Sequence, residues 1–157
     1  MRPAGIRPAL TCAEARRGEP RTREPGRRTD PRRGVGRHGE RLAAEHMRRL
    51  GFATLQQNAR TRHGEIDLIC FDGRTLVFAE VKTLRMSAGA RVPRLDQQPL
   101  AWLRRSQRER LRRLAVAWLS AEHRARPTAR TIRFDAIGVT IDAAGALQRI
   151  EHVEDAW

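Results

Sequence analysis

Aromatic residues are scarce in this chain, which has no tyrosine, four phenylalanines and three tryptophans among 157 residues. So few rings leave no obvious platform on which single-stranded bases can stack. The two cysteines, Cys12 and Cys70, predict neither a disulfide framework nor a zinc site, and a reducing cytoplasmic setting is the simplest. No apolar run approaches the roughly 20 residues that a membrane-spanning helix requires. The sequence also lacks a phosphate-binding loop, a dinucleotide-binding fingerprint and a Ser-His-Asp arrangement.

Acidic residues are in deficit, since 32 Lys and Arg residues against 18 Asp and Glu residues give a net charge of +14. A globular protein this basic usually has a polyanionic partner, and nucleic acid, DNA in particular, is the first candidate. With so few aromatic residues, recognition of the DNA backbone or shape is favoured over reading of bases. A membrane surface is a poorer partner, because no apolar amphipathic face accompanies the basic residues.

The first 33 residues differ from the rest of the chain, because they hold five of the eight prolines and ten of the arginines. Such a composition cannot bury enough apolar surface to fold, so we expect a disordered basic arm over residues 1–34. The alternative is that translation starts near Val35. The remaining residues, 35–157, suffice for one ordinary domain.

Hydrophobic periodicity predicts an α/β domain with a central mixed sheet of about five strands flanked by helices. A helical pattern from Gly36 to Leu50 ends at Gly51, a natural C-terminal cap. The other predicted elements are strands at residues 52–58, a hairpin within 64–82, a helix from 106 to near 123, and strands at 131–141 and 147–153. Residues 83–100 form a long loop that we expect to border the substrate and to become ordered on binding.

The hairpin over residues 64–82 is the centre of the predicted site. An Asp-Gly pair at residues 72–73, between runs rich in Ile, Leu, Val and Phe, is a strong turn signal. A two-residue loop and a four-residue loop are both open, and the longer one would put Asp67 directly opposite Glu80. Either loop gives the same two faces, since side chains alternate along a strand. One face is apolar and should pack against a helix, and it comprises Ile66, Leu68, Cys70, Val77, Ala79 and Val81.

Carboxylates gather on the other face of the hairpin, at the end far from its turn, where Glu65, Asp67, Glu80 and Lys82 lie together. Like charges opposite one another destabilise a sheet, so positive charge has to lie between them. Lys82 can supply part of it, and a divalent cation more. Mg²⁺ or Mn²⁺ suits the site, because such ions take oxygen ligands and are usually held by one or two carboxylates together with substrate phosphate. We therefore predict a metal site formed by Asp67, Glu80 and the Val81 carbonyl.

Lys82 is the only lysine in the chain, which has 31 arginines. Almost every position that needs only a positive charge is therefore an arginine. Lysine is a compact point charge with a tunable pKa, and arginine is a planar fork, so the two are not interchangeable. The pattern indicates that Lys82 orients a metal-bound water or stabilises charge that develops on a phosphate. The alternative is a chance remnant in an arginine-biased chain.

Asp67 followed by Glu80-Val81-Lys82 resembles the D…(D/E)-x-K signature of the PD-(D/E)XK nuclease superfamily. More narrowly, four motifs resemble the YraN-like family of uncharacterised bacterial proteins, which is similar to Holliday-junction resolvases. These motifs are Gly36-Arg-His-Gly-Glu40, Gln57-Asn-Ala-Arg60, Gly64-Glu-Ile-Asp-Leu-Ile69 and Val77-Phe-Ala-Glu-Val-Lys82. The resemblance covers residues 35–157 in order, and it implies a restriction-endonuclease-like fold and a metal-dependent endodeoxyribonuclease.

The resemblance also implies residues that assist the central site. In similar nucleases a helix before the sheet brings a third acidic group to the metal, directly or through water, and Glu40 has that place here. The alternative for Glu40 is a carboxylate that complements the helix dipole in the first turn. Gln107 stands where the family usually has a lysine, and we expect it to assist catalysis because related resolvases tolerate either residue. Resolvases that cut two strands symmetrically tend to be dimers, which implies a homodimer by analogy.

Arginines around the predicted site are candidates for contacts with DNA. Arg60 and Arg62, in a loop just before the hairpin, can grip phosphates that flank the scissile bond. A second group follows the basic face of the second helix, away from its apolar stripe, and includes Arg104, Arg105 and Arg108. The alternative for each of them is a solvated surface charge.

Histidines and aspartates outside the hairpin are interpreted as structural. His38 is expected at the surface and His46 in the core of the first helix. Asp135 and Asp142 are interpreted as a strand-edge residue and a turn residue rather than as metal ligands.

These patterns predict a metal-dependent endonuclease that hydrolyses DNA phosphodiester bonds, at branched or otherwise distorted structures. The alternative from another class is a non-catalytic nucleic-acid-binding module that keeps the nuclease fold, with the carboxylates and Lys82 as a structural charge cluster. A basic protein that assists RNA assembly ranks last, because it would explain the charge but not the ordered carboxylates.

Overall fold

The computed structural model describes residues 31–90, 99–100, 105–121 and 127–156. Its elements are α1 (Pro31–Arg49), β1 (Ala53–Thr61), β2 (Gly64–Phe71), β3 (Thr75–Arg85), α2 (Arg105–Leu119), β4 (Thr131–Ile141) and β5 (Leu147–Val153). The predicted α/β fold with a mixed five-stranded sheet is confirmed, and it is consistent with a restriction-endonuclease-like fold. Most of the expected arm, residues 91–98 of the expected substrate loop and Arg104 lie outside the described residues. The first three residues of that expected loop, 83–85, belong to β3, so the loop begins later than predicted. Neither helix is long and apolar enough to cross a membrane.

The sheet has the strand order β1-β2-β3-β4-β5. Only β3 and β4 run parallel, whereas the other neighbouring pairs are antiparallel. A parallel pair needs a long crossover connection, and α2 lies within the one that joins β3 to β4. The two C-terminal strands have the bounds that hydrophobic alternation predicts, and the turn between them includes Gly145 with a positive φ of 90°.

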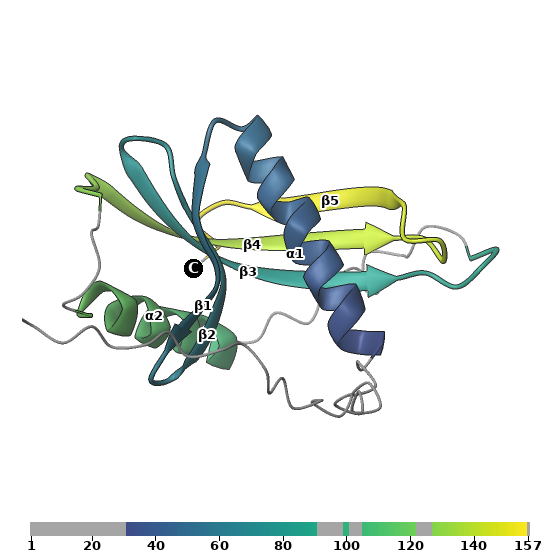
Figure 1. Ribbon diagram of the computed structural model, residues 1–157, viewed down its shortest axis with the longest axis horizontal. Coiled ribbons are helices and arrows are strands. Elements are labelled where there is room, and N and C mark those ends of the chain that lie inside the picture. Colours follow the sequence, from purple (N-terminus) through teal and green to yellow (C-terminus); the bar gives the residue numbers. More distant parts are fainter. Residues whose placement is uncertain (1–30, 91–98, 101–104, 122–126, 157) are drawn as a thin grey trace, which may run out of the picture.

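The two helices cover opposite faces of the sheet, as Figure 1 illustrates with α1 lying across β3, β4 and β5 and α2 lying beside β1 and β2. Ala43, Ala44 and Met47 of α1 pack on Leu68, Cys70, Val77, Ala79 and Val81. Leu111, Leu114, Ala115 and Trp118 of α2 pack on the other face, against Ile69, Leu76 and Phe78. The expected apolar face of the hairpin and the expected stripe of the second helix are therefore confirmed, with one exception.

The exception is Ile66, which was expected beside Leu68 but packs in the α2 cluster. The ladder between β2 and β3 ends at Leu68 and Ala79, whereas the β1–β2 ladder continues as far as Gly64. Two-stranded ribbons twist more strongly than wider sheets, so the faces of this segment rotate relative to the rest of the sheet. The simple alternation of side chains therefore fails beyond Leu68.

Helix α1 begins at Pro31, five residues before the predicted start, and ends at Arg49. Gly51 caps this end as predicted, with a φ of 91° and an N–H that donates to the Arg48 carbonyl at 3.0 Å. The helix packs tightly against the sheet at Gly39. A Cβ atom at this position would lie 1.8 Å from Oγ1 of Thr83 on β3. Only glycine allows this contact, which fixes the height of α1 above β3.

Replacing Gly39 by alanine is expected to lower the free energy of unfolding by about 1 to 3 kcal/mol, because α1 has to move away from Thr83. Gly34→Ala is the matched control on the same helix, since a Cβ atom there would meet nothing within 4 Å. That control should gain about 0.5 to 1 kcal/mol from the better helix propensity of alanine. Urea unfolding measures both changes, and equal stability of the two variants would contradict the close packing.

Asp135 is fully buried in the middle of the sheet, so its interpretation as a strand-edge residue is wrong. Its carboxylate accepts hydrogen bonds from Arg133 Nε at 2.9 Å, Arg133 Nη2 at 2.8 Å, His152 Nε2 at 2.8 Å and the Asp155 N–H at 3.1 Å. Burial opposes its ionisation, but His152 and Arg133 outweigh burial and hold the pKa of Asp135 below its usual value. The cluster extends to α1, because His46 lies 3.2 Å from His152.

Candidate functional site

The candidate site lies where β2 and β3 diverge and the backbone hydrogen bonds between them end. Phe71 is paired with Leu76, so the hairpin has the four-residue loop, and Asp67 and Glu80 directly follow the last ladder pair, Leu68 and Ala79. Beyond that pair the β2–β3 ladder offers the Val81 N–H no backbone partner in β2. The Asp67 carboxylate accepts it through Oδ2 at 2.8 Å. The side chain of Asp67 is thereby fixed between the two strands.

Glu80 and Lys82 project from the same side of β3. Glu80 is buried, and its Oε1 accepts a hydrogen bond from Lys82 Nζ at 2.5 Å. Its other oxygen, Oε2, lies 4.0 Å from Arg110 Nη1 of α2. Lys82 itself is 36% exposed, so its ammonium group reaches solvent while it holds Glu80. The predicted neighbourhood of Asp67, Glu80 and Lys82 is therefore present in the structure.

Glu40 approaches the same region from α1. Its Oε2 accepts a hydrogen bond from Asn58 Nδ2 at 2.7 Å, and its carboxylate is close enough to raise the pKa of Asp67. Because α1 begins at Pro31, Glu40 lies well inside the helix, and no acidic residue occupies the first turn. The alternative interpretation, a carboxylate that complements the helix dipole, is therefore wrong. Glu40 is therefore close enough to act on the charge of Asp67, but among the described residues it does not form with Asp67 and Glu80 a group of three arranged to hold a metal ion.

Glu65 does not join this group, although it was expected there. It follows the ribbon as it twists away, and its Oε1 accepts a hydrogen bond from Arg60 Nε at 3.0 Å. Its carbonyl lies 3.5 Å from Arg110 Nη2. Gly64, with a φ of 134°, leaves room for this arginine, since a Cβ atom there would lie 3.2 Å from Arg110 Nη2. The glycine thus gives the end of the Arg110 side chain slightly more room.

The concentration of negative charge has a clear effect on Asp67. Burial and the neighbouring carboxylate of Glu80 raise its pKa to about 7, and Glu40 adds a smaller contribution. The hydrogen bond from Val81 and the charge of Lys82 act in the opposite direction but do not compensate. The positive charge near Asp67 is therefore too small to offset burial and the Glu80 carboxylate, and additional positive charge at this place would favour the ionised form of Asp67.

The donor set fits a divalent cation that prefers oxygen. Asp67 keeps Oδ1 free of a described partner, and Glu80 Oε2 is beyond hydrogen-bond distance of Arg110. Among the described residues no group of three His, Cys, Asp or Glu side chains is arranged to hold a metal ion. Mg²⁺ does not need such a group, because it keeps several waters and commonly takes one or two carboxylates. Asp67, Glu80 and the Val81 carbonyl form a compatible partial shell.

Asp67→Asn is expected to raise the free energy of unfolding of the metal-free protein by at least about 1 kcal/mol above pH 7. The pKa of Asp67 is higher in the folded chain than its ordinary value of 3.8, so ionisation destabilises the fold increasingly as pH rises toward about 7. The asparagine oxygen can still accept the Val81 N–H. Denaturant unfolding should show the difference growing between pH 4 and pH 7 and then levelling off. A wild-type protein that is more stable than the variant at pH 8 would contradict the assignment.

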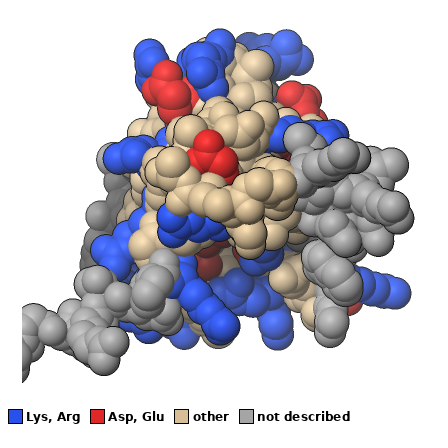
Figure 2. Space-filling model, turned by 90° about the vertical axis from the view of Figure 1, so that its right-hand side faces the viewer, with Lys and Arg blue, Asp and Glu red and all other residues tan. Residues whose placement is uncertain are grey.

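The described arginines among those predicted to contact DNA are exposed, but their settings differ. Arg60 lies within β1 rather than in a loop, and it is paired with Glu65. Arg62, in the β1–β2 turn, donates to His63 at 3.0 Å. Arg105 and Arg108 lie on the exposed face of α2, where Arg105 pairs with Glu109 at 3.3 Å. Figure 2 shows the face at the right-hand side of Figure 1, where basic side chains are spread widely and acidic side chains form small separate patches.

The structure locates three further residues around the carboxylates, of which only Gln107 was predicted from the sequence. Gln107 lies half-buried near the start of α2, one turn before Arg110. Arg110, which the sequence presents as one of many arginines on the helix, is the one that approaches Glu80. Asn58 holds Glu40, and its φ of 49° is one that asparagine tolerates better than most residues. The sequence signal that could have identified Asn58 is its place in the motif Gln57-Asn-Ala-Arg60.

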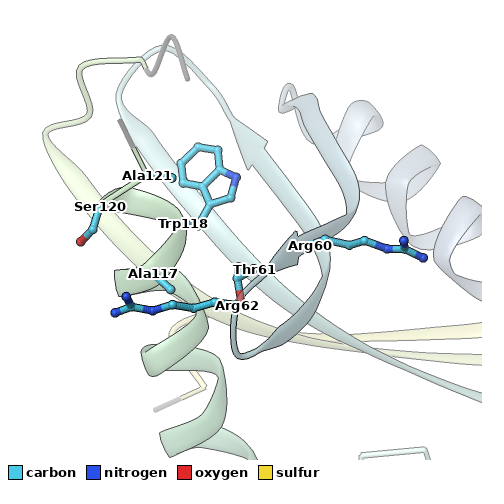
Figure 3. A pocket seen from close by; sticks show the side chains of 7 residues that line it. All are labelled: Arg60, Thr61, Arg62, Ala117, Trp118, Ser120 and Ala121. Carbon is cyan, nitrogen blue, oxygen red and sulfur yellow. The ribbon is translucent and has the colours of Figure 1, made fainter. Parts of the chain in front are cut away.

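A pocket of about 340 Å³ lies between the β1–β2 turn and the C-terminal end of α2. Figure 3 shows the side chains of Arg60 and Arg62 extending in opposite directions, with Arg62 reaching across α2 near Ala117. The floor is formed by Trp118, which is 4% exposed and donates through Nε1 to Gln56 Oε1 at 3.1 Å. None of the carboxylates of the site lines this pocket. It is therefore a gap at the end of the helix rather than part of the charged site.

A mixed five-stranded sheet with a helix on each face, and an Asp, a Glu and a Lys where two strands diverge, define a restriction-endonuclease-like α/β protein. The family model described as "Uncharacterised protein family UPF0102" matches residues 39–139. The chain belongs to this family, the YraN family, which lies in the PD-(D/E)XK-like nuclease superfamily.

Relatives of known sequence agree with this assignment along most of their length. A UPF0102 protein of Geobacter sulfurreducens is 39% identical over 123 residues, which are 78% of this chain and 88% of that protein. One of Rhodococcus opacus is 39% identical over 126 residues, covering 78% and 95% of the two chains. One of Streptomyces griseus is 40% identical over 112 residues, covering 71% and 87%. The family name states no activity.

Proposed function

We propose that the protein is a metal-dependent endonuclease that hydrolyses phosphodiester bonds in DNA, at branched or otherwise distorted structures. The observation that carries the proposal is the site at which Asp67, Glu80 and Lys82 meet, where the pKa of Asp67 rises to about 7. A chain does not maintain such repulsion for the sake of its fold, because it costs stability. The superfamily to which the protein belongs adds support.

The metal would be Mg²⁺ or Mn²⁺, held by Asp67, Glu80 and the Val81 carbonyl. When bound, such an ion neutralises charge on the phosphate and lowers the pKa of the attacking water. Asp67 and Glu80 provide negative charge for this purpose from two strands whose separation is fixed by the Val81 N–H bond. Glu40 can hold a further water through Oε1, because Asn58 occupies Oε2.

Lys82 has the central hydrogen-bond-donating role in this proposal. An ammonium group carries three N–H donors, and Glu80 takes one of them. The remaining donors can orient the attacking water and stabilise the charge that develops on the phosphate oxygens. Gln107 would be an auxiliary donor near the start of α2. Arg60, Arg62, Arg105 and Arg108, with Arg104 before them, would hold flanking phosphates, and a homodimer would supply two sites for symmetric cutting.

The second candidate is a nucleic-acid-binding module without catalysis. It is favoured by the tight pairing of Glu80 with Lys82 at 2.5 Å, which neutralises one carboxylate without a metal. In this alternative the arginines bind DNA, and the carboxylates only position Lys82 and Arg110. Its DNA affinity would depend on salt but not on divalent metal.

Cleavage of labelled DNA tests the proposal. Wild type and Asp67→Ala are each incubated with a four-way junction, a flap, a duplex and a single strand, in Mn²⁺, Mg²⁺ or EDTA. The proposal predicts cutting that requires metal and is lost in the variant, and the preferred substrate names the structure that is recognised. Tight binding without cutting, equal in both proteins, would support the binding module instead.

A further inference from the structure

We propose that a second, arginine-lined pocket beside the carboxylates binds a backbone phosphate of the DNA, next to the phosphodiester that is cleaved. The pocket lies between α1 and the β1–β2 ribbon and has a volume of about 560 Å³. Its lining consists of Arg33, Arg37, Asn58, Arg60 and Glu65. The inference rests on the proposed function, since it identifies how the same site grips its substrate.

Charge in this pocket is not balanced. Arg60 is already paired with Glu65 at 3.0 Å. Arg33 and Arg37 are exposed, and within the described ranges no carboxylate pairs with either of them. They are four residues apart on α1, so their side chains leave the same face of the helix. Two unpaired guanidinium groups that converge on one pocket are suited to a phosphate, which they can bind by charge-assisted hydrogen bonds.

Asn58 connects the pocket to the candidate catalytic site. It lines the pocket and also donates to Glu40 at 2.7 Å. On the opposite side of the carboxylates, Arg110 lies 4.0 Å from Glu80, and a smaller recess is lined by His63, Arg110, Arg113 and Leu114. The carboxylates thus lie between basic groups of α1 and basic groups of α2. A DNA strand that crosses them has a phosphate partner on each side of the scissile bond.

The other end of α1 provides a matched control. Arg48 and Arg49 are exposed like Arg33 and Arg37, but they line none of these pockets, and Arg48 is paired with Glu45 at 2.6 Å. The double variants Arg33→Gln/Arg37→Gln and Arg48→Gln/Arg49→Gln therefore make the same charge change on the same helix. Thermal unfolding is used to establish that both remain folded.

The test is fluorescence anisotropy of a labelled four-way junction with hairpin-capped arms, measured in EDTA over a series of salt concentrations. Each phosphate contact contributes about 0.9 to the slope of log affinity against log salt, so Arg33→Gln/Arg37→Gln should reduce the slope by about 1 to 2. Its affinity at moderate salt should fall on the order of tenfold. The control pair should leave the slope closer to that of wild type. Equal losses in the two double variants would overturn the inference, because they would reflect overall charge.

Two further comparisons separate a backbone phosphate from a terminal one, and failure of the pocket from failure of the nuclease proposal. Oligonucleotides with and without a 5′-phosphate distinguish a backbone phosphate from a terminal one, and an effect limited to phosphorylated ends would overturn the assignment. Binding in EDTA does not depend on cleavage. If wild type never cuts DNA but the slope differs as expected, the nuclease proposal fails and the pocket stands. If Arg33→Gln/Arg37→Gln cuts and binds like wild type, the pocket fails and the nuclease proposal stands.

Discussion

Lys82→Arg is expected to lower the single-turnover rate of DNA cleavage by about two to three orders of magnitude, although it keeps the positive charge. Lys82 Nζ lies 2.5 Å from Glu80 Oε1, beside Asp67, where a compact ammonium fits. A guanidinium is broader and planar, with its donors in a fixed fork. It can pair with Glu80 but cannot direct a separate donor at a water in the same small space.

Single-turnover kinetics with excess enzyme isolates the chemical step, and Lys82→Ala sets the baseline for complete loss of the ammonium. DNA affinity in EDTA should stay within about threefold of wild type, because the phosphate-binding arginines are unchanged. A Lys82→Arg variant that cuts at the wild-type rate would contradict the special role of the only lysine. A rate loss accompanied by loss of structure in circular dichroism would count against the role assigned to it here.

Asp135→Ala is expected to lower the free energy of unfolding by about 3 to 5 kcal/mol, a large part of the stability of a domain this size. The carboxylate accepts four hydrogen bonds, including two from Arg133 and one from His152. Its removal leaves a largely buried guanidinium without its main counter-ion, because Arg133 is only 17% exposed. Its other partner, Glu154, is 57% exposed and cannot compensate.

Glu154→Ala is the matched control for this cluster, since it removes the exposed partner of the same arginine. It should cost less than about 1 kcal/mol, as exposed ion pairs generally do. Urea unfolding of both variants near pH 7 measures the difference. If Asp135→Ala were no less stable than Glu154→Ala, the network would not stabilise the fold as argued. In wild type this stabilisation should be complete above the ordinary aspartate pKa of 3.8. It should decline as pH falls further, and it should be lost once pH passes below the depressed pKa that Asp135 has in the folded chain.

Much of the architecture follows from local patterns in the chain. Regular alternation and a glycine-containing turn define β4 and β5, whose predicted and observed bounds agree. The stripe of α2 is also confirmed. The failures occur where tertiary structure overrides local pattern. Residues before Gly36 carry no apolar periodicity, so the start of α1 was missed, and the continued ribbon of β1 and β2 placed Arg60 in a strand.

The candidate site was more predictable than its surroundings. Asp67, Glu80 and Lys82 meet because they lie at one end of a hairpin whose register depends on a four-residue loop. Glu40 required the family resemblance, since its approach depends on the contact of Gly39 with Thr83. Arg110 was beyond sequence reasoning, because its role depends on how α2 packs against the hairpin. Asn58 lies in a recognised motif, but its hydrogen bond to Glu40 depends on how α1 and β1 pack together. The buried position of Asp135 likewise depends on β5 covering the edge of β4.

Thermal unfolding of the DNA-free protein during a titration with Mn²⁺ or Mg²⁺ tests the central claim most directly, with EDTA as reference and Asp67→Asn in parallel. A ligand that binds only the folded state stabilises it by RT ln(1 + [L]/Kd). The account predicts that the wild-type melting temperature rises with metal concentration, whereas the variant starts higher and shows little further rise. A wild-type melting temperature that is the same in metal and in EDTA, or an equal rise in both proteins, would contradict a metal site at Asp67 and Glu80.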